Sequence, residues 1–181
     1  TAEDAAYSLN AAGTCTDVDA SDTLEYTISG APSTITATTA GVISGTPTNA
    51  NVGAHTITVT CTDGSDATAT DSYVLTVTNV NDVPSITSTA DTTATEDAAY
   101  AYVITATDDE GQTITMTGTT IPSWAEFVDV GSGTAVLSGT PANGDVGSHS
   151  VVITATDASS GSSTQSFTIV VSNTNDAATI D

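Results

Sequence analysis

The sequence predicts an all-β fold arranged as two tandem β-sandwich domains, and three observations lead to this prediction. Hydrophobic residues make up 38% of the 181 residues but aromatic residues only 4%, so any core must be thin and aliphatic. Threonine, valine and isoleucine are abundant, and these residues favour pleated, half-buried strands over helices. Finally, no window shows a helical period, whereas several motifs occur twice in the same order.

The repeated motifs indicate a tandem duplication of a unit of about ninety residues. The offset between the two copies is 93 residues at the start of the unit and 94 later. Three pairs of segments carry the match: AEDAAYSL at Ala2–Leu9 with TEDAAYAY at Thr95–Tyr102, SGTPTNANVGAHTITVTCTD at Ser44–Asp63 with SGTPANGDVGSHSVVITATD at Ser138–Asp157, and VTNVNDVPSI at Val77–Ile86 with VSNTNDAATI at Val171–Ile180.

Within each unit, apolar residues alternate with polar residues over short segments, which is the pattern of half-buried strands. Gly, Pro, Asn and Asp separate these segments, so we expect roughly seven strands per unit in an Ig-like sandwich. Pro84 stiffens a short linker, and we place the domains at residues 1–83 and 84–181. The clearest inward faces are Ile57, Val59 and Cys61; Tyr73, Leu75 and Val77; Tyr100, Tyr102, Ile104 and Ala106; and Phe167, Ile169 and Val171.

The charge of the chain excludes two classes of partner. Twenty-two acidic residues and no Lys or Arg give a net charge of -22, with two histidines. Such a surface repels nucleic acid and anionic lipid, because it has no basic group to neutralise either one. An acidic, threonine-rich chain could also be disordered, but disordered segments have no need of a strand period. No run reaches membrane-spanning length and no signal peptide is evident, so we expect a mature fragment or an excerpt of a longer protein.

The ordered motifs resemble a known class of repeat over nearly the whole chain. Each unit has an early acidic residue, an SGTP segment, a VG segment that leads to a TD dipeptide, and a closing NxND segment. The second unit adds a PSW segment with a phenylalanine three residues after the tryptophan. This arrangement is similar to the cadherin-like repeats of dystroglycan type and to the related putative-Ig repeats of large bacterial surface proteins. The resemblance implies two Ig-like, Greek-key β-sandwich domains.

The resemblance also implies calcium at the junction between successive domains, because cadherin-type repeats bind it there. Calcium takes six to eight hard oxygen ligands, which carboxylates and carbonyls supply. Asn79 stands where cadherins usually have an aspartate, and SGTP replaces the cadherin DRE segment, so we expect one or two ions per junction. The matching residues at the central junction are Glu3 on the first strand, Asn79, Asn81 and Asp82 in the linker motif, Asp108 and Glu110 with Asp109 as a substitute, and Asp157.

The same matching places half of a calcium site at each end of the chain. These half-sites would be completed either by neighbouring repeats of a longer array or by identical subunits that meet head to tail. We expect Asp22, by contrast, to be a turn residue. The residues of the two half-sites are Asp17, Asp19 and Asp63 in the first unit, and Glu96, Asn173, Asn175 and Asp176 in the second.

An electrostatic argument supports these ligands independently of the resemblance. Five carboxylates gathered with no basic partner would repel one another by several kcal/mol per pair at an effective dielectric of ~20. A divalent cation removes that cost. The alternative is that these Asp and Asn residues are ordinary turn and strand-end residues.

Cys15 and Cys61 are predicted to form a disulfide. They match Ala106 and Ala155 in the second unit, and this paired replacement suggests that the two positions touch. The bond would close a loop of about 47 residues and contribute roughly 3–4 kcal/mol on the chain-entropy model. It would also imply an oxidising, extracellular setting. Two small buried thiols are the alternative.

Catalysis has little support in the sequence. His55 and His149 occupy equivalent places in different units, so we expect packed strand residues rather than a shared metal site or a triad. Trp124 and Phe127 have no aromatic counterpart in the first unit and could cap the core or begin a sugar-binding platform.

We therefore predict a non-enzymatic, calcium-rigidified structural module of an extracellular, prokaryotic surface protein. It would act in cell adhesion or surface assembly, either as an adhesin stalk or as a head-to-tail filament subunit. The alternative is a carbohydrate- or protein-binding module of a secreted protein.

Overall fold

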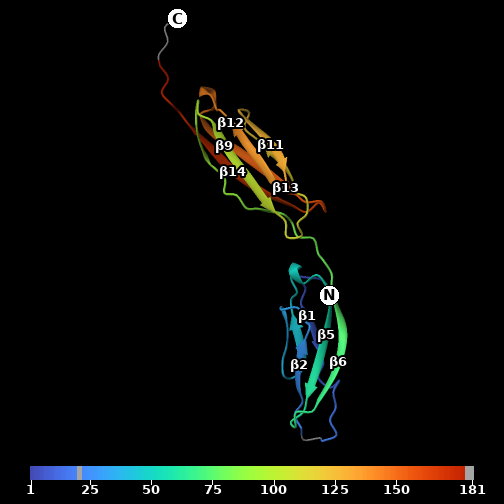
Figure 1. Cartoon of the computed structure of the whole chain (residues 1–181). Helices are drawn as coiled ribbons and strands as arrows, with labels where there is room; N and C mark the ends of the chain where they lie inside the picture. The colour runs from blue at the N-terminus through green and yellow to red at the C-terminus, as the bar shows by residue number, and fades with distance from the viewer. Residues whose placement is uncertain (20–21, 178–181) are drawn as a thin grey trace. The chain divides into compact units, whose positions relative to one another are not determined.

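A computed structural model describes residues 1–19 and 22–177 and confirms the all-β prediction. The chain forms two compact units, Thr1–Val80 and Asn81–Asp181, each of which is described here by itself (Figure 1). Apart from strands, the described residues contain only two short 3-10 turns, Asn49–Asn51 and Asn143–Asp145.

The first unit is a sandwich of two three-stranded antiparallel sheets. One sheet has the order β1-β4-β3 and the other the order β2-β5-β6. A parallel bridge between Ala2 and Thr78 adds the start of the chain to the edge beyond β6. The strands are β1 (Tyr7–Asn10), β2 (Glu25–Ser29), β3 (Ile35–Ala37), β4 (Val42–Gly45), β5 (Gly53–Thr62) and β6 (Thr68–Val77).

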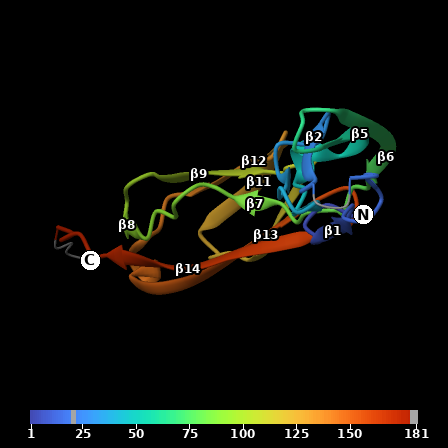
Figure 2. The same cartoon turned by 90° about the horizontal axis from the view of Figure 1, so that it is seen from below.

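The second unit repeats this plan with two four-stranded sheets, of order β10-β13-β14-β8 and β11-β12-β9-β7. The long strands β13 and β14 run side by side through one sheet (Figure 2). The eight strands among its described residues exceed the expected seven because the first strand is split in two. They are β7 (Ser85–Ile86), β8 (Thr93–Thr95), β9 (Tyr100–Thr107), β10 (Thr115–Thr120), β11 (Ala125–Gly131), β12 (Thr134–Gly139), β13 (Gly147–Thr156) and β14 (Ser162–Ser172).

The alternation of apolar residues places the core of each unit between its two sheets. In β9 every second residue is buried, so all four predicted inward residues, Tyr100, Tyr102, Ile104 and Ala106, lie in the core of the second unit. The predicted faces of the other strands also point inward. Val59 and Tyr73 are only partly buried, at the margin of the first core, and Phe167 is partly buried at the margin of the second. The two cores are separate clusters, which agrees with a duplication of one unit.

Aromatic side chains extend the core of the second unit. The ring of Trp124 packs edge-on against Tyr100, with centroids 5.6 Å apart, and against His149, with centroids 5.9 Å apart. The His149 ring nitrogen Nε2 lies 2.6 Å from the carbonyl oxygen of Asp145, and His55 makes the equivalent contact with Asn51 in the first unit. The tryptophan and both histidines are therefore packing residues of the sandwich.

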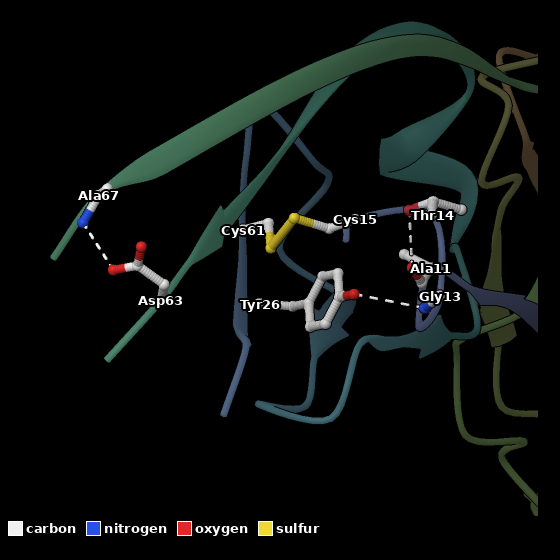
Figure 3. The surroundings of a disulfide bond; sticks show 8 residues. All are labelled: Ala11, Gly13, Thr14, Cys15, Tyr26, Cys61, Asp63 and Ala67. Carbon is white, nitrogen blue, oxygen red and sulfur yellow. Dashed lines mark hydrogen bonds between the residues drawn. A yellow bond between two sulfur atoms is a disulfide. The ribbon is translucent and has the colours of Figure 1, made fainter. Parts of the chain in front are cut away.

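Cys15 and Cys61 form the predicted disulfide, with their Cα atoms 6.5 Å apart. The bond links the segment that follows β1 to the end of β5, and therefore ties the two sheets of the first unit together. The ring of Tyr26 lies beside it, and its hydroxyl accepts a hydrogen bond from the backbone of Gly13 (Figure 3). Among the described residues, no helix combines the length and the apolar character that crossing a membrane requires.

The disulfide stabilises only the first unit, and the single tryptophan, which lies in the second, allows the unfolding of the two units to be distinguished. Replacing both Cys15 and Cys61 with alanine should lower the free energy of unfolding of the first unit by about 3–4 kcal/mol, because the unfolded chain loses a cross-link. Trp124 fluorescence reports the second unit, whose denaturant midpoint should not move. Circular dichroism, which sees both units, should show the first transition at lower denaturant. A shift of the tryptophan transition alone would contradict this account.

Candidate functional site

Near its start, each unit has a glutamate that equivalent backbone hydrogen bonds hold in the same geometry, which is called the backbone frame below. The amide of Glu3 donates to the carbonyl of Thr78 at 3.0 Å, and the amide of Asp4 donates to that of Pro47 at 2.8 Å. Asp4 adopts a left-handed conformation with φ of 55°, which Asp tolerates better than most residues. Glu96 and Asp97 repeat this geometry with Ser172 and Pro141, so the Glu-Asp dipeptide and the SGTP proline fix the glutamate in both units.

The carboxylates of these two glutamates are buried and only half satisfied. Glu3 and Glu96 are each 1% exposed. One oxygen of Glu3 accepts a hydrogen bond from the amide of Val80 at 2.8 Å, and one oxygen of Glu96 accepts from Thr174 at 2.7 Å. The second oxygen, Oε2, is buried in both residues and has no hydrogen-bond partner among residues 1–19 and 22–177. Burying a charged oxygen in this way is costly unless a cation or a proton compensates it.

Three aspartates of the first unit converge next to the disulfide. Asp17, Asp22 and Asp63 each offer an oxygen atom, and these atoms lie within 4.8 Å of one another. Asp63 is oriented by the amides of Ser65 and Ala67, which donate to its Oδ1 at 2.8 and 2.9 Å. Figure 3 shows the hydrogen bond from Ala67. The structure thus brings together two of the predicted residues, Asp17 and Asp63.

Asp22 completes this group, although the sequence suggested only a turn residue there. It does lie in a turn, because its amide donates to the carbonyl of Asp19 at 2.9 Å. Asp19 itself is exposed and supports Asp17 from outside the group, through an amide hydrogen bond of 2.7 Å. Tyr26 and Met116 occupy equivalent positions, because they lie opposite Cys61 and Ala155. Counting back four residues from each aligns Asp22 with Gln112, which belongs to the equivalent group of the second unit.

The equivalent group of the second unit is a connected hydrogen-bond network. The side-chain amide of Asn81 donates to Asp157 Oδ2 at 2.9 Å, while the amides of Ser159 and Gly161 donate to Oδ1 at 2.8 Å. The Gln112 side chain donates to Asn81 Oδ1 and accepts a hydrogen bond of 3.0 Å from the Ser159 hydroxyl. This network fixes the linker residue Asn81 on the second unit.

The remaining predicted residues of this group lie beside the network. Asp108 accepts a hydrogen bond of 2.9 Å from the amide of Gln112 through Oδ1. Its Oδ2 is buried and has no hydrogen-bond partner in the part of the chain that the structure describes. The amide of Asp82 faces the Glu110 carboxylate at 3.2 and 3.3 Å. Asp109 points into solvent, so the structure gives it no place in the network.

The predicted residues at the ends of the two units are more exposed. Asn79 lies on the surface of the first unit. Asn173 and Asn175 donate to the carbonyls of the residues that follow them, and Asn143 donates to Asp176 Oδ2 at 2.7 Å. Glu96 is therefore the buried member of this set, as Glu3 is in the first unit.

The oxygen-only donor set fits a hard divalent cation. Both cysteines are consumed in the disulfide, and both histidine rings contact backbone carbonyls. Carboxylate and amide oxygens, which suit calcium and magnesium, are what remain. Three of the buried side-chain atoms without a partner, on Glu3, Glu96 and Asp108, belong to residues that the sequence predicted as calcium ligands.

Comparison with known proteins identifies the family of both units. The family described as Putative Ig domain matches residues 1–78 and 83–172. The chain belongs to this family. Its membership covers both sandwiches, and together with the disulfide it indicates an extracellular protein. No curated protein sequence matches the chain.

The chain is similar to several solved structures. The protocadherin PcdhgB3 EC1-4 matches with 20% identity and a TM-score of 0.54, covering 84% of this chain and 41% of that one. An endo-fucoidan hydrolase from glycoside hydrolase family 107 matches with 24% identity and a TM-score of 0.45, covering 96% of this chain and 27% of that one. The SrpA adhesin from Streptococcus sanguinis matches with 19% identity and a TM-score of 0.43, covering 52% and 59%. Of these three, the protocadherin shows a shared cadherin-like fold. This chain spans less than half of the protocadherin and about a quarter of the hydrolase.

The hydrogen bond from Asn81 should be visible in the titration of Asp157. It is the largest of the effects that lower the pKa of Asp157 below the ordinary 3.8, and the backbone amides lower it further while burial opposes them. A lowered folded pKa stabilises the fold above the unfolded pKa, and this contribution is lost as the pH falls through the folded value. In chelator, Asn81→Ala should therefore raise the pKa of Asp157 toward 3.8 and reduce the acid sensitivity of the fold.

Carboxyl-carbon NMR titration measures this change directly. Asn175→Ala is the matched control, because that amide donates to the backbone of Asp176 and should leave Asp157 unaffected. An unchanged Asp157 pKa in Asn81→Ala would show that the backbone amides alone hold the carboxylate ionised.

Proposed function

We propose that this chain is a structural, calcium-rigidified repeat module of an extracellular, prokaryotic surface protein. It serves in an adhesin stalk or as the subunit of a head-to-tail filament, and it is not an enzyme. The Ig-like family of both units and the cadherin-like fold support a surface or adhesion module. The disulfide supports an oxidising compartment.

One observation carries the calcium part of the proposal. In both units a glutamate in the same backbone frame is 1% exposed and has one oxygen without a hydrogen-bond partner. The whole sequence contains no Lys or Arg that could pair with it. A divalent cation offsets the desolvation of such a carboxylate and the repulsion from neighbouring acids at the same time.

The residues proposed to hold calcium fall into two kinds. A donating set lies at the closing end of a repeat, and consists of Glu3, Asn79, Asn81 and Asp82 for the first repeat and of Glu96, Asn173, Asn175 and Asp176 for the second. A receiving set lies at the opening end of a repeat, and consists of Asp17, Asp22 and Asp63, with Asp19 outside it, for the first repeat and of Asp108, Glu110 and Asp157 for the second. The rigidifying role rests on the resemblance to cadherin-type repeats, where the ion lies between successive domains. Calcium would supply the positive charge that these oxygens lack.

The sugar-binding alternative has less support. It requires an exposed aromatic surface, and Trp124 instead packs edge-on against Tyr100 and His149.

Calcium titration of single-glutamate variants tests the proposal. Calcium should raise the melting temperature of the wild-type chain, because a ligand that binds only the folded state stabilises it by mass action. Glu3→Gln should abolish or strongly reduce that rise for the first unit. In chelator the same variant should be as stable as the wild type or more so, because it no longer buries a partly unpaired charge.

The matched control is Glu25→Gln, which removes the same charge from an exposed position on β2. It should keep the full response to calcium. Calorimetry with calcium, with magnesium and with chelator separates a specific site from general screening of the -22 charge. An identical response of wild type and Glu3→Gln would rule out Glu3 as a ligand.

A further inference from the structure

Strand β11 forms a free edge of the second unit. It pairs with β12 on one side (Figure 1), and it is the last strand in the sheet order β11-β12-β9-β7. Among the described residues, no strand pairs with its other side. A free edge presents a row of unpaired backbone N–H and C=O groups, and a further strand can add to such a row.

The corresponding edge of the first unit is much shorter. There β3 has three residues, Ile35–Ala37, whereas β11 has seven, Ala125–Gly131. The two strands correspond because the first residue of each lies opposite the glycine of the SGTP segment, Gly45 in one unit and Gly139 in the other. A very short edge strand is a common protection against pairing, and β11 lacks this protection.

The longer hairpin carries an apolar row on the outer face of its sheet. Val128 of β11 lies opposite Val136 of β12, which lies opposite Val103 of β9, and residues paired in this way point to the same face. These three residues are called the valine row below. Val103 and Val128 are 54% and 44% exposed, and Val130 further along β11 is 60% exposed. The first unit has Asn10 at the position of Val103, so the row belongs to the second unit alone.

The carboxylate of Asp129 protects the neighbouring edge strand, β10, and leaves β11 open. Its Oδ2 accepts a hydrogen bond of 3.0 Å from the amide of Met116 on β10, so that backbone donor is already occupied. Its Oδ1 accepts a hydrogen bond of 2.9 Å from the amide of Gly131. Both oxygens of Asp129 are therefore engaged within the second unit, and neither has to be desolvated alone when a strand adds to β11.

Charge decides which partner suits this edge. On β9, β11 and β12, all of which the structure describes, Glu126 is the one acidic residue that shares the face of the valine row. A second copy of the chain also has a net charge of -22, so two copies repel each other least where acidic residues are sparse. A partner rich in Lys and Arg would instead be attracted to the acidic groups described above.

We propose that β11 pairs antiparallel with β11 of a second copy of the chain, about a two-fold axis beside Val128. The sheets of the two copies then become continuous, and their valine rows join across the axis. In this register Glu126 of one copy faces Val130 of the other. Asp129 likewise faces Phe127. An axis beside Glu126 or Asp129 would place two carboxylates opposite each other, and like charges in that arrangement destabilise a strand pair.

This inference goes beyond the proposed function and does not rest on it. Strand β11 contains none of the proposed calcium ligands, and the contact is isologous, so it closes at two copies instead of continuing head to tail. Added sodium chloride should strengthen the contact, because salt screens the repulsion between two chains of charge -22 and leaves the apolar contact in place.

The test uses sedimentation equilibrium of the full 181-residue chain at high salt in chelator. Wild-type chains of 17.9 kDa should dimerise. Val128→Asp should raise the dissociation constant of the dimer at least about tenfold, because two like charges then meet at the axis in place of an apolar pair. The matched control is Val170→Asp, which puts the same charge at a valine of β14 that is 50% exposed. It should dimerise like the wild type.

A mixture of two variants tests the position of the axis. Val128→Lys should also weaken dimerisation by itself, because it again places like charges at the axis. Mixed with Val128→Asp, it should restore a dimer that contains one chain of each, because opposite charges then face each other. A mixture of Val170→Lys and Val170→Asp should associate no more than either variant alone. Equal restoration in both mixtures would show general attraction between the chains and would overturn the register.

Amide hydrogen exchange identifies the strand that pairs. Exchange at residues 125–131 should slow as wild-type chains dimerise, and exchange at residues 115–120 of β10 should not. Wild-type chains that stay monomeric at millimolar concentration and high salt would overturn the proposal. Dimers that Val128→Asp and Val170→Asp weaken equally, or protection confined to β10, would overturn it as well.

The same samples separate this inference from the proposed function. Dimers that depend on Val128 but form equally with calcium and with chelator would support pairing through β11 whatever the outcome of the Glu3→Gln titration. A calcium-dependent melting temperature in chains that stay monomeric would support the calcium role and overturn the pairing.

Discussion

The complete absence of Lys and Arg is the constraint on which the acidic sites of this protein depend. Twenty-two carboxylates must be satisfied by backbone amides, side-chain amides, water or cations, because the sequence offers no basic side chain. Asp157 accepts hydrogen bonds from two backbone amides and from the Asn81 side chain, and these bonds lower its pKa. Glu3 and Glu96 receive one amide each and keep one buried oxygen unpaired. The fold therefore satisfies Asp157 more fully than it satisfies the two glutamates, and the proposed calcium would compensate for that difference.

The fold could be predicted from the sequence because its signals are local and are repeated. Alternation along β9 and β14 defined the inward faces, and the duplicated motifs defined two units. The paired replacement of Cys15 and Cys61 by alanines was enough to predict the disulfide, because covarying positions in two copies of a fold report contact. The split of the first strand into β7 and β8 was not foreseen, since two- and three-residue strands carry no measurable period.

The sites were less predictable because they depend on loop geometry. Asp19 and Asp22 are three residues apart in an acidic loop, and the sequence favoured the former. The structure turns Asp19 outward, where its amide supports Asp17, and brings Asp22 toward Asp63. The burial of Glu3 and Glu96 follows from backbone contacts with Thr78 and Ser172, which lie far away in sequence. Only the three-dimensional frame shows that their second oxygen lacks a partner.

The two units solve the same packing problem in different ways. In the second unit, β7 pairs with the segment around Ala106, and Tyr102 of β9 packs against Phe167 of the opposite sheet. In the first unit the disulfide holds the corresponding Cys15 to Cys61, although no described strand covers it. The side chains of both cysteines lie against the core of the first unit, so the covalent link holds there what strand pairing and aromatic packing hold in the second. The same packing requirement is therefore met by a cross-link in one copy of the duplicated unit and by noncovalent contacts in the other.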